Sequence, residues 1–240
     1  MGKHMRGVAA LAVAALLLAG CAKLQEIPYD HASAGQIHSI GILTPRAPEH
    51  PSVILASTVG QSFGLVGALI DAGLQSSRES NFTAMLQQQS FSEQDCFVAS
   101  LTEALQAQGY TVSMVPVVRD PKGGFLVKYP IGPDPQADAY LDLVIGFYGY
   151  IAAGVVGDTP YRPHFAVAVR LVNARDGSVL MQDAVFYNPI RNPSNAVTIA
   201  PDPALRYGTF DALMADPPGA ITGLRLATEQ SAQTVGKLLQ

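Results

Sequence analysis

The sequence predicts an α+β fold: a single domain in which a mixed or antiparallel sheet of about four to five strands is packed by helices. Three observations support this class. The 240 residues are 48% hydrophobic and only 14% charged, which suits one packed domain and excludes a disordered chain. The candidate elements follow the order strand, helices, strand, loop, strand, hairpin and closing helix, which is typical of an α+β fold. Residues 161–173 place Phe165, Val167, Val169 and Leu171 on one face, and Asp176-Gly177 makes a tight turn into a partner strand over 178–187, which predicts a hairpin.

The first twenty residues predict a signal peptide of the lipoprotein type. Lys3 and Arg6 give it a basic start, and residues 8–18 are an unbroken run of Val, Ala and Leu. This run is shorter than the roughly 20 residues that a membrane-spanning helix needs. It leads into a Leu-Ala-Gly-Cys motif ending at Cys21, which resembles the lipobox of bacterial lipoproteins. The alternative is an ordinary secretory signal with a chance cysteine.

The lipobox resemblance implies that Cys21 is lipidated and that residues 21–36 form a lipidated tether to a domain over residues 37–240. Ala22 follows the cysteine, whereas Asp there is the usual inner-membrane retention signal. We therefore expect a protein held in the outer membrane by acyl chains such as palmitate, with its domain facing the periplasm. Cys96 would remain as a single thiol, and we expect it to act as a small buried hydrophobe.

The first half of the domain should contain a strand over 37–43 and two helical stretches over 57–75 and 79–108, the second interrupted near Ser90. Ser92 can cap the later helix, with Asp95 three residues on, and Gly109 suits a left-handed helix end.

The second half should contain strands over 110–118 and 140–150 before the hairpin, with a Pro- and Gly-rich loop over 119–138. Residues 188–216 are expected to be irregular. A final helix should begin after Asp216, with Pro217 in its first turn.

A repeat of small residues marks the segment 53–74. In a helix, small side chains at every fourth position would form one stripe that allows a second helix to approach closely. The members of this stripe are Ala56, Gly60, Gly64, Ala68 and Ala72. The helix could pack on the sheet of its own domain, associate with a second copy, or insert in a membrane, which Asp71 disfavours.

The same segment contains Gly60-Gln61-Ser62-Phe63-Gly64, a G-x-S-x-G pattern typical of the nucleophile elbow of α/β-hydrolases. A triad would join Ser62 to His164, with Asp142 or Asp158 as the acid. Few residues precede Ser62, however, and His164 begins a predicted strand. We therefore expect a non-catalytic protein, with a periplasmic serine esterase as the alternative.

Neither a cofactor nor a metal is expected. His31, His38 and His50 lack the spacing of a zinc site. The aspartates at 134, 138 and 142 lack the regular spacing of a calcium loop. Three tyrosines on predicted strands form either core or a surface patch: Tyr148, Tyr150 and Tyr161. The formal net charge of −4 and the absence of a basic cluster exclude nucleic acid as a partner.

Two stretches carry a family resemblance. Residues 138–146 (DAYLDLVIG) and 171–180 (LVNARDGSVL) resemble strand and hairpin motifs of the periplasmic domains of the curli secretion channel family and of exopolysaccharide-export lipoproteins, with Asn173 where Asp is usual. The resemblance implies an outer-membrane lipoprotein with a structural, assembly or export-accessory role and no catalytic residues. Its partners would be the membrane, through the lipid anchor, and either further copies of itself or other envelope proteins.

Overall fold

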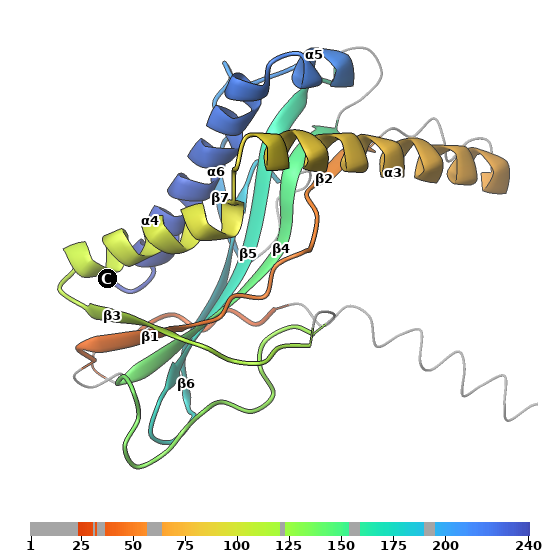
Figure 1. Ribbon diagram of the computed structural model, residues 1–240. Coiled ribbons are helices and arrows are strands. Elements are labelled where there is room, and N and C mark those ends of the chain that lie inside the picture. Colours follow the sequence, from red (N-terminus) through yellow and green to blue (C-terminus); the bar gives the residue numbers. More distant parts are fainter. Residues whose placement is uncertain are drawn as a thin grey trace, which may run out of the picture.

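The structure is a computed structural model that describes residues 24–30, 32, 37–56, 64–120, 123–153, 159–189 and 195–240 (Figure 1). The strands are β1 (Ser39–Leu43), β2 (Ser52–Ala56), β3 (Thr111–Val115), β4 (Ala139–Ala153), β5 (Tyr161–Asn173), β6 (Val179–Tyr187) and β7 (Val197–Ile199). The helices are α3 (Gly64–Gln88), α4 (Glu93–Ala107), α5 (Phe210–Met214) and α6 (Pro217–Lys237). This mixed arrangement confirms the predicted α+β class.

The strands form one seven-stranded sheet: six follow the order β3-β1-β4-β5-β6-β7, and β2 pairs with β4 outside that order. β4 and β5 are long antiparallel neighbours, and β6 continues the predicted hairpin. β1 runs parallel to the first half of β4, and β2 runs parallel to its second half. The prediction of four to five strands was therefore too low, because β2 and β7 were not expected as strands of this sheet.

Gly149 explains how β2 lies so close to β4. This residue has a φ of +139°, a conformation that residues with side chains rarely adopt. A Cβ atom at this position would overlap the carbonyl oxygen of Ser52 in β2. Glycine therefore permits the pairing of Ser52 with Gly149 that begins the β2–β4 ladder.

Helices α4 and α6 pack on one face of the sheet and enclose the main core with it. That core includes Leu101 and Leu105 from α4, Val235 from α6, and Phe165 and Val167 from β5. The expected helix ends are confirmed. Ser92 accepts a hydrogen bond of 3.3 Å from the Asp95 amide, and Gly109 has a φ of +91°. Asp216 accepts one of 3.1 Å from the Gly219 amide, with Pro217 in the first turn of α6.

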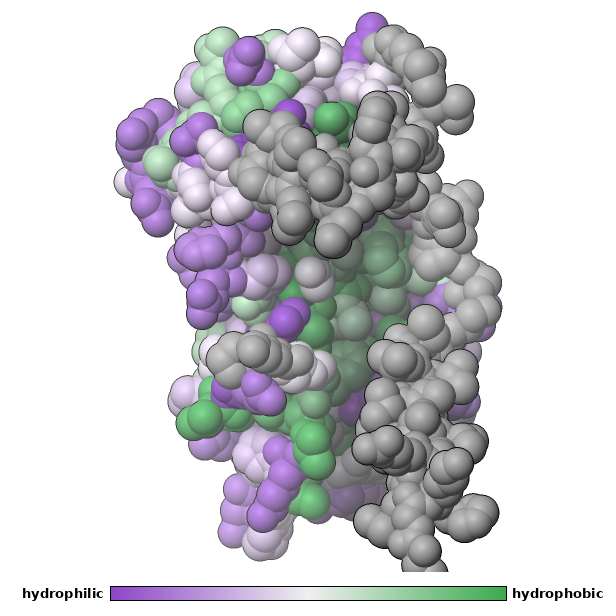
Figure 2. Space-filling view, turned by 90° about the vertical axis from the view of Figure 1, so that its right-hand side faces the viewer, coloured by the Kyte–Doolittle hydropathy of each residue, from purple (hydrophilic) through white to green (hydrophobic). Residues whose placement is uncertain are grey.

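Helix α3 is one continuous element where two helical stretches were predicted. The predicted interruption at Ser90 is confirmed, since this residue has a φ of +51° between α3 and α4. Figure 1 shows the start of α3 extending beyond the sheet. The core takes Phe82, Met85 and Leu86 from the other end of the helix. Figure 2 views the molecule from the side toward which α3 points, where hydrophobic surface gathers below the helix.

Candidate functional site

The segment that follows the expected lipidation site is built into the edge of the sheet. Ile27 pairs with Gln182 of β6 through two backbone hydrogen bonds of 2.8 Å. The Gln182 side chain also donates to the carbonyl oxygen of Gln25, at 2.6 Å. Residues 24–30 were expected to belong to a tether, and the structure instead docks this part on β6. Cys21 itself lies outside the described residues.

The stripe of small residues does not form one helical face. Ala56 is the last residue of β2, where it pairs with Ala153, so the helical assignment at this position was wrong. The pairing of β2 with its partner strand overrides the four-residue spacing. Gly64, Ala68 and Ala72 do lie in α3 at helical spacing. Gly60 lies outside the described residues.

The structure separates two of the side chains considered for a catalytic triad. Asp142 in β4 lies opposite Arg170 in the register of β5. His164 lies six residues from Arg170 along β5, which at the rise of a β-strand separates the Asp142 and His164 positions by about 20 Å. The His164 ring donates from Nδ1 to the Asn188 carbonyl oxygen at 2.7 Å, and burial lowers its pKa below 6.5. Ser62 and Asp158 lie outside the described residues. Asp142 is therefore not the acid of a triad with His164.

Asp142 instead holds the loop after β3 against the sheet. Its fully buried carboxylate forms an ion pair with Arg119. The second carboxylate oxygen accepts hydrogen bonds from the Leu126 amide at 2.7 Å and the Tyr129 hydroxyl at 3.0 Å. Arg119 also donates to the carbonyl oxygen of Thr44. This network joins β4 to the loop after β3 and to Thr44.

The remaining polar candidates have structural roles or lie apart. Asp138 accepts from the backbone amides of His38 and Ser39 at the start of β1. Asp134 and His50 are exposed. His31 lies outside the described residues. Within the part of the chain that the structure describes, no cluster of three or more His, Cys, Asp or Glu side chains could hold a metal ion.

The three tyrosines divide between core and cavity. Tyr150 and Tyr161 are buried, and Tyr150 donates to the Ala220 carbonyl oxygen at 2.9 Å. Tyr148 is half-buried and lines a cavity. Cys96 is also half-buried, and burial raises the pKa of its thiol.

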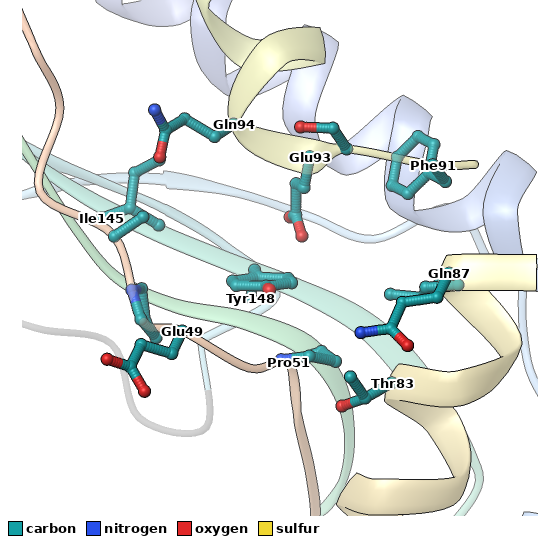
Figure 3. Close-up of a pocket in the computed structure, with 13 residues that line it drawn as sticks. Glu49, Pro51, Thr83, Gln87, Phe91, Glu93, Gln94, Ile145 and Tyr148 are labelled. Carbon is teal, nitrogen blue, oxygen red and sulfur yellow. The ribbon is translucent and has the colours of Figure 1, made fainter.

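A cavity beside Tyr148 is lined by polar side chains from several elements. It has a volume of about 280 Å³ and lies between the loop before β2, the end of α3, the start of α4, and β4. Its polar lining includes Glu49, Thr83, Gln87, Glu93 and Gln94. Figure 3 shows the Glu93 carboxyl group pointing from α4 toward the Tyr148 ring, with Glu49 and Gln87 on opposite sides of the cavity.

Glu93 is an unusual residue for such a place. Its side chain is 5% exposed, and its Oε2 atom has no hydrogen-bond partner. Burial raises the pKa of Glu93 well above 4.5, and a contact with Thr228 only partly opposes that effect. Burial, and secondly the proximity of Glu93, raise the pKa of Tyr148 to about 12. The cavity therefore contains a carboxyl group that favours its neutral form beside a neutral phenol.

Sequence reasoning missed this cavity. Glu93 follows the helix cap Ser92, and an acidic residue in the first turn of a helix ordinarily faces solvent. The side chain becomes buried because α6 brings Thr228 against it, 135 residues later in the chain. Its burial thus depends on tertiary packing that no local signal reports.

None of the helices in the described part of the chain is long and apolar enough to cross a membrane.

No protein-family model and no curated protein matches the chain in sequence. Among solved structures, the chain is similar to a Xanthomonas campestris protein described under the family model DUF330, with 9% identity and a TM-score of 0.39 over 90% of this chain and 86% of that one. It is also similar to the PelC dodecamer from Paraburkholderia phytofirmans, with 11% identity and a TM-score of 0.36 over 91% of this chain and 96% of that one. At such low identity, function has to be inferred from the residues of this chain.

Proposed function

We propose that the chain is a non-catalytic lipoprotein of the outer membrane, with its domain in the periplasm and a structural, assembly or export-accessory role. One observation carries the proposal. The Leu-Ala-Gly-Cys motif at Cys21 stands immediately before a segment that the fold holds at its sheet edge, through Gln25 and Ile27. An anchor and a domain are thus joined with almost no free chain between them.

The short connection sets the orientation of the domain. Three steps along the chain separate Cys21 from Leu24, the first described residue, and a fully extended chain covers about 11 Å in three steps. Acylation of Cys21 therefore brings the β6 edge to the bilayer surface. Several acyl chains, at about 0.8 kcal/mol per buried CH₂ group, make the attachment firm.

Labelling and fractionation test the anchor. The wild-type chain, expressed in a diderm host with radiolabelled palmitate, should carry the label and sediment with the outer membrane. Cys21→Ser should lose both properties. Cys96→Ser is the matched control and should keep both, because Cys96 is part of the folded domain. Label on the Cys21→Ser variant, or a soluble wild-type protein, contradicts the anchor.

Helix α3 supports a role in self-association. Its start extends beyond the sheet (Figure 1). Gly64, Ala68 and Ala72 recur in the first part of its sequence at helical spacing. Light scattering on the lipidated protein in detergent should give a discrete oligomer, which Ala68→Lys should dissociate while leaving the domain folded. A monomeric wild-type protein contradicts self-association and leaves docking to another envelope protein.

The absence of catalysis is also part of the proposal. Two observations support this absence: Asp142 and His164 lie far apart along the sheet, and the Asp142 carboxylate already forms an ion pair with Arg119. Hydrolysis of p-nitrophenyl acetate by the wild type and by Ser62→Ala should be equal and no faster than buffer. A rate that Ser62→Ala abolishes would establish the esterase instead.

A further inference from the structure

The cavity between α3, α4 and β4 has one polar atom without a partner in the protein. Oε2 of Glu93 is buried and accepts no hydrogen bond, and the carboxyl group points toward the Tyr148 ring across the lining of the cavity (Figure 3). A buried oxygen that lacks a partner is costly, and most such atoms in folded proteins are satisfied. A ligand that donates a hydrogen bond to Oε2 would remove that cost.

The two carboxyl oxygens of Glu93 differ in their partners. Thr228 has one hydroxyl hydrogen, and its Oγ1 lies 2.7 Å from the Leu224 carbonyl oxygen, which can only accept. The same Oγ1 lies 3.3 Å from Oε1 of Glu93. The hydroxyl is thus the donor toward both acceptors. Oε1 therefore has a partner within the protein, whereas Oε2 has none.

The lining of the cavity favours a positively charged donor. It contains two carboxyl groups, Glu49 at the exposed rim and Glu93 inside, and no Lys, Arg or His. The Tyr148 ring supplies a face that attracts both cations and apolar groups. Phe91, whose ring has the Arg225 guanidinium 5.5 Å from its centroid, supplies apolar surface. A volume of about 280 Å³ exceeds the roughly 150 Å³ of an engineered cavity that takes benzene. One ring with a short polar arm would fit.

We propose that this cavity binds a small primary amine in its protonated form, with the ammonium group on Oε2 of Glu93 and an apolar body against Tyr148. The site stands on described residues alone and is independent of how the chain is anchored.

Binding exchanges one proton. The neutral Glu93 loses its proton to solvent as the ammonium enters, and a carboxylate–ammonium pair replaces the buried acid. Charge inside the cavity is conserved, since one positive ion arrives and one proton leaves. The titratable groups near Glu93 come from several elements: Glu49 from the loop before β2, Tyr148 and Tyr150 from β4, and Cys96 from α4. Two charged groups of α6, Arg225 and Glu229, act on Cys96 in turn.

Calorimetry on the full chain in detergent tests the site with benzylamine as the probe. Titrations at pH 6 and pH 7, each in two buffers of different ionisation enthalpy, report both affinity and protons released. At pH values below the raised pKa of Glu93, binding of benzylamine should release one proton from Glu93 to solvent. The affinity should then increase by up to about tenfold for each unit that the pH rises. Benzyl alcohol, which has the same ring and no charge, should bind at least tenfold more weakly and release no proton.

Three variants separate the site from a general effect. Glu93→Gln should lose the proton release and at least tenfold in affinity. Tyr148→Leu should weaken binding about tenfold while keeping the proton release. Glu103→Gln changes an exposed acid on the same helix and should alter neither quantity. Circular dichroism checks that each variant is folded.

Several results overturn the proposal: no saturable binding of benzylamine by the wild type, equal binding of benzyl alcohol, or proton release that persists in Glu93→Gln. If Glu93→Gln does not fold, the two-buffer titration of the wild type and the Tyr148→Leu variant still decide the question.

Discussion

The side-chain amide of Gln182 donates a hydrogen bond of 2.6 Å to the carbonyl oxygen of Gln25, across 157 positions of the chain. The other end of the same amide accepts a hydrogen bond of 2.6 Å from Nε of Arg170. Arg170 in turn lies 4.2 Å above the Phe125 ring and donates to the Tyr129 hydroxyl, which contacts Asp142. One network therefore joins the N-terminal segment, the sheet, and the loop after β3.

Gln182→Ala should release the N-terminal segment from β6. The change removes the donor to Gln25 and the acceptor for Arg170, so the free energy of unfolding should fall by about 1–3 kcal/mol. Hydrogen exchange at the Ile27 amide should accelerate more than exchange in β5. Gln136→Ala, at an exposed loop position, is the control and should change neither quantity. Unchanged protection of Ile27 would contradict a docking role for Gln182.

Asp142→Asn should be among the most destabilising single changes in the domain. It leaves the guanidinium of Arg119 buried without a counter-charge, for which a loss of about 3–5 kcal/mol is typical. Urea denaturation measures the loss. The double variant Asp142→Leu/Arg119→Met should be more stable than Asp142→Asn, because no unpaired charge remains. Asp134→Asn, an exposed acid in the same loop, should cost less than about 0.5 kcal/mol.

Gly149→Ala should disrupt the pairing of β2 with β4. The added methyl group would overlap the Ser52 carbonyl oxygen, and the φ of +139° would be strained for alanine. A loss of at least about 3 kcal/mol in the free energy of unfolding is expected. Gly146→Ala on the same strand is the control, since its Cβ would lie 4.0 Å from the Ala166 carbonyl oxygen. Equal stability of the two variants would contradict the close approach of Ser52 to Gly149.

Stability should depend on pH through Glu93. Because its pKa is raised in the folded state, the folded protein binds this proton more tightly than the unfolded chain does. The free energy of unfolding should therefore decrease as pH rises from about 4.5 to the raised pKa, by at most about 1.4 kcal/mol per pH unit. Glu93→Gln should lack this decrease. Chemical denaturation from pH 4 to pH 8 gives the free energy of unfolding of the wild type and of Glu93→Gln. If the two free energies change with pH in the same way, Glu93 does not contribute.

Local signals were sufficient to predict those elements that depend on their own sequence. The hairpin of β5 and β6 has Phe165, Val167, Val169 and Leu171 at every second position of β5 and Gly177 in a left-handed conformation. The caps Ser92 and Asp216 bond to amides within their own first turns. These capping bonds span three residues, so the sequence pattern contains both partners.

The missed elements depend on partners that are distant in the chain. β2 is five residues long and β7 three, and each pairs with one strand brought beside it by the fold. α5 is a single short helix in a segment rich in proline. The cavity likewise collects Glu49, Glu93 and Tyr148 from three separate segments. Neither periodicity nor spacing along one segment can predict such combinations.

The intact mass of the protein isolated from the membranes of a diderm host is the decisive test of the proposed lipid anchor. We predict a chain that begins at Cys21 and carries a diacylglyceryl group there, with an additional mass that disappears in Cys21→Ser. An N-terminus at any other residue, or an unmodified Cys21 on the mature chain, would contradict the anchor.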